Sequence, residues 1–194
     1  MLTDHLTVAL KEWAVVQRSL LEGHQIILLR KGGLIEESGD FDLRAGQFLL
    51  YPTYAHETER AGDVQPCFRQ WLGEEEARKT VPTEIRIEAA AEVSDVVRVD
   101  DRAKLLNLAP QHIWSPQFIY GRYDWEPYKP VFVLLLRAYR LAAPVARPVL
   151  TQYGGCRSWV EMAEPVSTVG AVPAVSDERY QCRRELTLRL LASE

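Results

Sequence analysis

The sequence predicts an α+β fold, a small mixed or antiparallel β-barrel with an N-terminal helix and one or two helices on its rim. Strand patterns outnumber helical patterns along the chain. They follow in the order helix, strand, strand, insertion, strand, helix, strand, strand. The chain has 194 residues, which is enough for one domain with a substantial core.

The first predicted element is a helix over residues 3–22. Its apolar residues recur at spacings of three and four, the pattern of one buried helix face: Leu6, Leu10, Trp13, Leu20 and Leu21. Gly23 suits the position directly after a helix, because glycine adopts the left-handed conformation that ends many helices.

Two buried strands are predicted next, over Gln25–Leu29 and Gln47–Tyr51. Their continuous apolar runs indicate strands covered on both faces. Phe41 and Leu43 alternate with polar residues, as in a short half-buried strand between the two.

The middle of the chain is less regular at first. Residues 57–82 are predicted to form an exposed insertion with a short helix near 73–79, because their charge is high and their periodicity weak. Alternating apolar residues over Glu84–Val99 predict a long strand with a bulge near Ser94 and Asp95. A short helix is expected over Asp101–Leu108.

Val131–Leu141 is the strongest strand pattern of the second half, and Ser158–Met162 is predicted as the final strand. Residues 164–178 read as a linker and residues 178–192 as a short charged helix. We therefore expect a single domain over 1–163, followed by a linker and a short C-terminal helix over 164–194.

Composition narrows the function classes. The net charge of −4 argues against a protein that coats nucleic acid without sequence preference, but it allows a local basic groove. The longest apolar run, Val131–Leu136, is too short to cross a bilayer, so we expect no membrane partner and a cytoplasmic protein. The three cysteines form no CxxC pair, and no His, Cys, Asp and Glu set has metal-ligand spacing. We expect neither a metal nor a cofactor, and a homo-oligomer is open but not indicated.

The predicted ligand site consists of cations, glycines and aromatic residues that follow the strand ends. Arginine binds phosphate with two parallel N–H groups, exposed glycine backbone approaches anions closely, and aromatic rings stack on bases. The candidates are Arg30, Lys31, Gly32, Gly33, Thr53, His56, Arg137, Tyr139, Arg157 and Trp159. The alternative is that these arginines are solvated or pair with nearby carboxylates, and that Trp159 belongs to the core.

Six segments resemble a bacterial family catalogued as a domain of unknown function, over roughly residues 9–162. They are ALKEWAVV (9–16), IILLRKGG (26–33), FLLYPTYAHE (48–57), HIWS (112–115), VLLLRAYRL (133–141) and YGGCRSWVEM (153–162). This resemblance implies no activity, and the tail after Met162 is expected to lie outside it.

The order of elements also resembles PUA-like domains, above all the ASCH branch. The stretches 23–30 and 45–51 are similar to that branch's first two strands, although Leu28 stands where the group often has an acidic residue. The resemblance implies a PUA-like barrel that binds RNA or a nucleotide, and some ASCH members are ribonucleases. Metal-independent RNA cleavage would use the 2′-hydroxyl, with His56 or Lys31 as the base and an arginine stabilising the charge.

Three functions follow as hypotheses. The first is RNA or nucleotide binding in a cationic groove, with or without cleavage. The second is a non-catalytic protein-interaction or structural domain that uses residues 57–82 and 164–194, and a third, fainter one is a metal-dependent nuclease. The first two are distinguished by whether the cations at 30–31, 137 and 157 converge on one concave face or pair with carboxylates.

Overall fold

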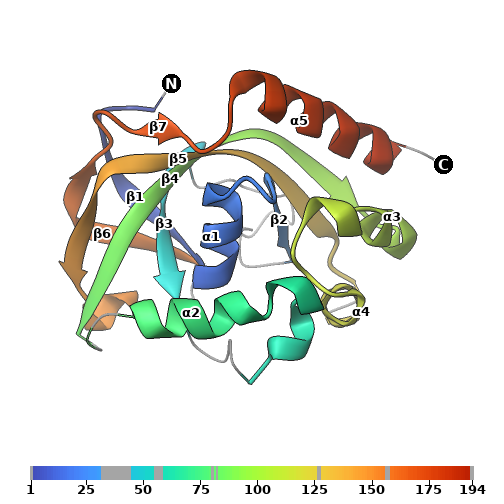
Figure 1. The fold of residues 1–194 in the computed structure, drawn as a ribbon, viewed down its shortest axis with the longest axis horizontal. Coiled ribbons are helices and arrows are strands. Elements are labelled where there is room, and N and C mark those ends of the chain that lie inside the picture. Colours follow the sequence, from blue (N-terminus) through green and yellow to red (C-terminus); the bar gives the residue numbers. More distant parts are fainter. Residues whose placement is uncertain are drawn as a thin grey trace.

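The computed structural model describes residues 2–31, 45–54, 59–79, 81, 83–125, 128–155 and 158–192. A seven-stranded sheet forms its centre, in the order β2-β5-β4-β3-β1-β6, with β7 paired to β5 (Figure 1). The strands are β1 (His5–Trp13), β2 (Ile27–Arg30), β3 (Gln47–Thr53), β4 (Glu84–Val99), β5 (Val131–Pro148), β6 (Trp159–Ser167) and β7 (Val172–Pro173). The α-helices are α1 (Ala14–Leu21), α2 (Gln70–Arg78), α3 (Arg102–Asn107), α4 (Pro116–Asp124) and α5 (Asp177–Ala192). Short 3-10 helices cover Ala61–Asp63, Pro66–Phe68, Ala109–Gln111 and Thr151–Tyr153.

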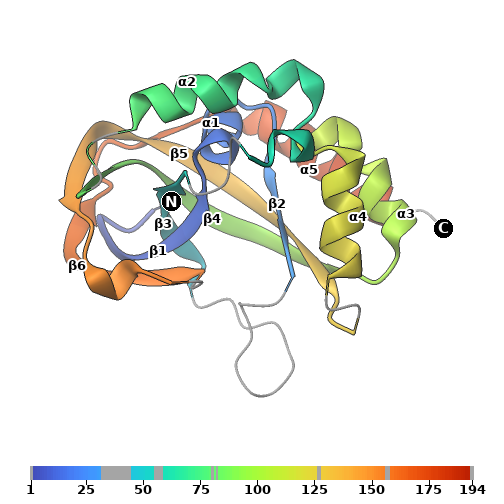
Figure 2. The same ribbon diagram turned by 90° about the horizontal axis from the view of Figure 1, so that it is seen from below.

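The predicted α+β class with a mixed sheet is confirmed. β1 and β3 are parallel, and the other strand pairs are antiparallel. The long strands β4 and β5 run through the whole molecule. Figure 2 shows α3 and α4 at one end of them and β6 at the other. None of the described helices is long and apolar enough to span a bilayer.

The predicted helix over residues 3–22 is wrong in its first half, where the chain forms β1. β1 pairs with β3 on one side and β6 on the other, and α1 begins only at Ala14. Alternate residues of β1 enter two different cores, Leu10 the larger and Ala9 the smaller. Because both faces of β1 are buried, its apolar residues imitate helical spacing, and long-range strand pairing decides the structure.

The predictions for β4 and α3 are confirmed. β4 has the predicted bounds, and its register with β5 shifts between Ile87 and Ala89 and again between Val93 and Asp95. The side chain of Asp101 caps α3 by accepting the Ala103 N–H at 2.7 Å. Such a cap satisfies a backbone donor that the first helical turn leaves unpaired.

Other boundaries need correction. β5 continues past Leu141 to Pro148, because its second half pairs with the start of β4. The predicted linker over 164–178 contains the end of β6 and all of β7, while α5 agrees with the predicted C-terminal helix. In the segment 57–82, Val64 and Leu72 are buried in the larger core. The predicted strand around Phe41 and Leu43 lies outside the described residues.

The alternation along β1 also positions a charged group. Leu10 faces the larger core, and Glu12, two residues later, lies on the same face at the end of the strand. A carboxylate carried to the edge of a core needs a partner, because burial of an unpaired charge is costly. The partner comes from β2.

Candidate functional site

Glu12 and Arg30 form a buried ion pair where β1 and β2 end. The Arg30 Nη2 donates to Glu12 Oε2 at 2.7 Å and to the Lys11 carbonyl at 2.9 Å. Both side chains are about nine-tenths buried, with 12% and 10% of their surfaces exposed. Glu12 Oε1 accepts the N–H of Trp13 at 2.9 Å. The carboxylate is thereby fixed, and removal of either partner would leave a buried charge.

Arg122 brings a second guanidinium to this pair from α4. The pKa of Arg122 is lowered to about 10, first because the group is desolvated and next because Arg30 lies near it. Arg60 lowers this pKa further, while Glu12 and Asp63 oppose the shift. Within the described chain, no carboxylate lies within ion-pair distance of Arg122. Three guanidinium groups therefore face two carboxylates, and the cluster carries an excess of positive charge.

Aromatic rings support the cluster. Arg60 forms an ion pair with Asp63 at 2.5 Å, and its guanidinium lies 5.6 Å from the centre of the Trp13 ring. Arg122 lies 5.1 Å from the centre of the Phe118 ring. Both distances allow cation–π attraction. Trp114 joins the two rings, edge-on to Trp13 at 5.2 Å and stacked on Phe118 at 3.8 Å.

Two adjoining hollows open beside these arginines. One, of about 340 Å³, is lined by Arg60, Phe118, Gly121, Arg122 and Trp125. The other, of about 450 Å³, is lined by Glu59, Arg60, Gly62, Asp63, Gln117, Phe118 and Gly121. Because they share Arg60, Phe118 and Gly121, we treat them as one surface and call it the α4 groove. Their volumes fall within the range of roughly 300 to 1,000 Å³ that is usual for small-molecule sites.

Helix geometry explains why one face of α4 lines the groove. Phe118, Gly121, Arg122 and Trp125 are spaced by three and four residues, so they share one face. The helix starts at a capped position, where the Ser115 hydroxyl accepts the Phe118 N–H at 3.3 Å. The cap and the buried Phe118 ring fix the helix against the core, and Arg122 is thereby held at the groove.

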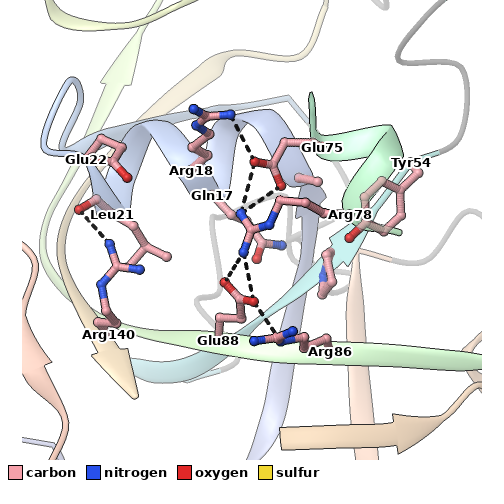
Figure 3. Close-up of a pocket in the computed structure, with 12 residues that line it drawn as sticks. Gln17, Arg18, Leu21, Glu22, Tyr54, Glu75, Arg78, Arg86, Glu88 and Arg140 are labelled. Atoms are coloured by element: carbon pink, nitrogen blue, oxygen red, sulfur yellow. Dashed lines mark hydrogen bonds and ion pairs between the residues drawn. The ribbon is translucent and has the colours of Figure 1, made fainter. Parts of the chain in front are cut away.

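A second cleft lies between α1, α2 and the sheet, and Figure 3 shows its side chains. It has a volume of about 190 Å³, below the usual range for ligand sites. Its cations and carboxylates alternate as a ladder with contacts of 2.6 to 3.1 Å: Arg18–Glu74, Arg78–Glu75, Arg78–Glu88 and Arg86–Glu88. These charges balance, and they tie α2 to α1 and β4. We therefore assign this cleft a structural role.

The structure places the first group of predicted site residues as follows. Arg30 belongs to the cluster, and Thr53 is the register partner of Trp13 in the β1–β3 pair. Lys31 is corrected. Its side chain is buried, with 3% of the residue exposed, and Nζ donates to the Tyr123 carbonyl, so it does not face a groove as a base. Gly32, Gly33, His56 and Arg157 lie outside the described residues.

Arg137, Tyr139 and Trp159, the remaining predicted site residues, lie away from Arg30. Arg137 forms an ion pair with Asp177 and lies over the Tyr180 ring at 5.1 Å. Arg30 is the register partner of Phe132, so Arg137 lies five residues further along β5, roughly 16 Å away. The cations at these two positions therefore do not converge on one face.

The aromatic members of that group are in the core or at its edge. Tyr139 is buried, and its hydroxyl donates to Glu92 at 3.3 Å. Trp159 packs edge-on against Phe48 at 5.1 Å, with 9% of its surface exposed. The prediction that Trp159 stacks on a ligand is therefore corrected, because its ring already packs in the core.

Sequence reasoning missed Glu12, Arg60 and Arg122. A local signal existed only for α4, where the spacing of Phe118, Arg122 and Trp125 places an arginine and an exposed tryptophan on one face. The described residues contain no group of three or more His, Cys, Asp or Glu side chains arranged to hold a metal ion.

Four of the six segments that carry the family resemblance meet at this cluster. They contribute Glu12 and Trp13, Arg30, Thr53, and Trp114. Residues that are far apart in the sequence are thus brought to one place.

The chain was compared with solved structures, with curated proteins and with models of protein families. Three solved structures of the ASCH protein of Zymomonas mobilis are similar to the chain, each with 12% sequence identity. The match to the unmutated protein has a TM-score of 0.45 and covers 96% of this chain and 96% of that protein's chain. Two single-residue mutants have TM-scores of 0.47 and 0.45, covering 95% and 92% of this chain and 99% and 96% of theirs. No curated protein matches the chain.

A family model matches residues 9–185. The match runs past Met162 into α5, so the expectation that the tail lies outside the family is wrong. The chain belongs to the family described as a domain of unknown function, DUF1802.

Proposed function

We propose that the chain binds single-stranded RNA or a nucleotide through the α4 groove. The observation that carries the proposal is Arg122, a guanidinium crowded by Arg30 and Arg60 and without an ion-pair partner among the described residues. Burial and, after it, the nearby Arg30 lower the pKa of Arg122, and an anion placed there would offset the repulsion between the two guanidinium groups. A phosphate suits the site, because a guanidinium binds it with two parallel hydrogen bonds.

Trp125 supplies the second part of the site. Its side chain is 53% exposed and lines the same hollow as Arg122. An exposed indole beside an arginine is the combination with which proteins hold single-stranded nucleic acid, by base stacking and phosphate pairing. Base stacking on such a ring contributes about 1 to 3 kcal/mol per base.

The test is the binding of labelled single-stranded RNA and DNA at low and moderate salt, measured by fluorescence anisotropy. Arg122→Met removes the charge and keeps much of the side-chain length, and Trp125→Leu removes the stacking surface. The matched control is Arg102→Met, since Arg102 packs over Tyr120 at 5.0 Å on the opposite side of α4.

We expect Arg122→Met to weaken binding by about tenfold and to lower the salt slope by about one, as for the loss of one phosphate contact. Trp125→Leu should weaken binding with little change in the slope. Arg102→Met should behave as the parent. Equal affinity of the Arg122 and Arg102 variants, or no binding of either polymer, would overturn the proposal.

Cleavage is tested on the same RNA by gel electrophoresis in EDTA. His56→Ala is the informative variant, because Lys31 is buried and hydrogen-bonded to Tyr123. Cleavage by the parent that the variant lacks would support metal-independent chemistry with His56 as the base. Intact RNA would leave a binding domain without this activity.

The second candidate function is a non-catalytic protein-interaction domain. It is favoured by the pairing of Arg30 with Glu12 and of Arg137 with Asp177, which satisfies two cations predicted to bind ligand. Failure of both polymers to bind, with folded protein shown by circular dichroism, would favour this candidate.

A further inference from the structure

We infer that Arg140, Arg179 and Arg183 form a second anion-binding site, which binds a phosphate group carrying two negative charges. The three side chains meet at the end of α1, and none of them lines the α4 groove. The inference therefore goes beyond the proposed function and does not depend on it.

Two guanidinium groups of α5 meet at one backbone oxygen. Arg179 Nη2 donates to the Gly23 carbonyl at 3.0 Å, and Arg183 Nη1 donates to the same oxygen. Arg183 Nη2 also donates to the His24 carbonyl at 2.8 Å. Because both guanidinium groups are within hydrogen-bond distance of a single atom, two positive charges lie close together.

Arg140 brings a third guanidinium to this turn from β5. Its Nη2 donates to the Leu21 carbonyl at 3.4 Å, and Figure 3 shows the side chain reaching that oxygen from the sheet. Glu22, the residue after Leu21, is exposed and supplies the one carboxylate of the turn 21–24. Three positive charges and one negative charge leave an excess of two positive charges.

The positive charges of this turn lack ion-pair partners. Within the described residues, no carboxylate lies within ion-pair distance of any of the three arginines, whereas the adjacent Arg184 pairs with Asp95 at 2.6 Å. Arg179 and Arg183 are four residues apart on α5, a spacing at which like charges repel. Burial and, next, the charge of Arg179 lower the pKa of Arg183. An anion at this place would offset the repulsion.

Helix capping accounts for part of the arrangement. Arginine side chains often donate to the last carbonyls of a helix and interact favourably with the negative end of its dipole. That end is equivalent to about half a negative charge, so most of the excess remains. Arg140 and Arg179 are also exposed residues, and each uses one side-chain nitrogen in its hydrogen bond. Because a guanidinium has five N–H groups, donors remain for a ligand.

A terminal or free phosphate matches this site better than other common anions. It carries about 1.5 to 2 negative charges at neutral pH, close to the excess of two, and its three oxygens can accept from separate guanidinium groups. A carboxylate has one charge and two oxygens in one plane, so a single arginine satisfies it. An internal phosphodiester of RNA also carries one charge.

The experiment follows the backbone amide signals of the isotope-labelled full chain by NMR during titration with sodium phosphate at about pH 7.5, where phosphate esters are dianions. Sodium chloride keeps the ionic strength constant. The amides of Gly23 and His24 report on this site, and those of Gly121 and Arg122 report on the α4 groove. We expect saturable shifts at Gly23 and His24.

Arg179→Met tests the site directly. The residue is exposed, so the fold should persist, which a thermal melt would verify. The variant should bind phosphate at Gly23 and His24 about tenfold more weakly, as for the loss of a charged hydrogen bond. Arg189→Met is the matched control and should bind as the parent does, because Arg189 lies on the same helix and also donates to a carbonyl, that of Glu185 at 3.4 Å. Equal affinity of the two variants would overturn the site and leave these arginines as caps of α1.

Two RNA oligonucleotides, one with a 5′-phosphate and one with a 5′-hydroxyl, distinguish the sources of the phosphate. Shifts at Gly23 and His24 with the phosphorylated RNA alone would identify an RNA end as the ligand. Shifts with inorganic phosphate and with neither RNA would identify a small phosphate compound. Equal shifts with both RNAs would overturn the assignment of a doubly charged group.

The remaining outcomes separate the site from other readings. Sodium acetate at the same ionic strength should cause no comparable shifts, and equal shifts with acetate would favour an acidic peptide and overturn the phosphate assignment. Phosphate shifts at Gly121 and Arg122 with none at Gly23 and His24 would overturn this site and leave the α4 groove standing. The opposite pattern, without RNA binding, would support this site and count against the proposed function.

Discussion

Replacement of His112 by asparagine should make the free energy of unfolding less sensitive to acid. Between pH 7 and pH 5 the variant should lose roughly 2 kcal/mol less of it than the parent. His112 is 3% exposed, and burial lowers its pKa to about 4. Its Nδ1 accepts the N–H of Trp114 at 3.1 Å. An asparagine Oδ1 stands at the same distance along the side chain as Nδ1 and accepts the same N–H, but it does not titrate.

The magnitude follows from the two pKa values. The folded chain favours the neutral imidazole, with a pKa of about 4, whereas the unfolded chain protonates it near 6.5. The stability associated with the neutral form is therefore complete above pH 6.5 and is lost as the pH falls towards 4. The full loss amounts to roughly 3 kcal/mol, of which about 2 kcal/mol falls between pH 7 and pH 5.

The assay is urea unfolding of the parent and the variant at both pH values, followed by circular dichroism. Carboxylates also titrate towards pH 5, but their contribution is common to both proteins and cancels in the difference. The parent should lose about 2 kcal/mol more than the variant over this interval. Equal losses in the two proteins would refute the conclusion that His112 is buried in its neutral form.

Three further substitutions test other parts of the fold. Gly23→Ala should destabilise by about 1 to 3 kcal/mol, as a lower melting temperature, because Gly23 has φ +70° and a Cβ there would lie 2.5 Å from Val175 Cγ1; an unchanged melt would contradict this. Asp95→Asn should cost about 1 kcal/mol at pH 7 in urea unfolding. The hydrogen bond from Arg184 lowers the pKa of Asp95 below its ordinary 3.8, so the cost should shrink as the pH falls below that value, and a constant cost would argue against the pair. Phe48→Ala should cost about 3 to 5 kcal/mol because Phe48 is fully buried, and a loss below about 1 kcal/mol would be incompatible with a close-packed site.

The parts of the fold that the sequence predicted correctly are those where local pattern and tertiary environment agree. β4 alternates, is half exposed over much of its length and carries its bulge where the alternation breaks near Ser94. β1 was mistaken for a helix because it lies between two neighbouring strands and two cores. No local spacing records that its partners are β3 and β6, one of which lies about 150 residues away along the chain.

The site residues that could be predicted from the sequence are likewise those with a local signal. Arg30 was identified because it directly follows a buried strand, which is a local signal. Its pairing with Glu12 and its closeness to Arg122 depend on the packing of β1 and α4, and neither is visible in a linear pattern. Lys31 carries the same local signal as Arg30, but its side chain is buried and donates to the Tyr123 carbonyl of α4.

The pairing of β1 with β6 has a consequence for synthesis. Residues His5–Trp13 are made well before one of their two neighbouring strands, Trp159–Ser167, which follows about 150 residues later in the chain. The loop after α1 also lacks some of its hydrogen bonds until α5 is made, because Arg179 and Arg183 of α5 donate to the carbonyls of Gly23 and His24. A nascent chain therefore holds an open edge at β1 until β6 has been made. The interval is one in which a chaperone, or a second nascent copy, has access to β1.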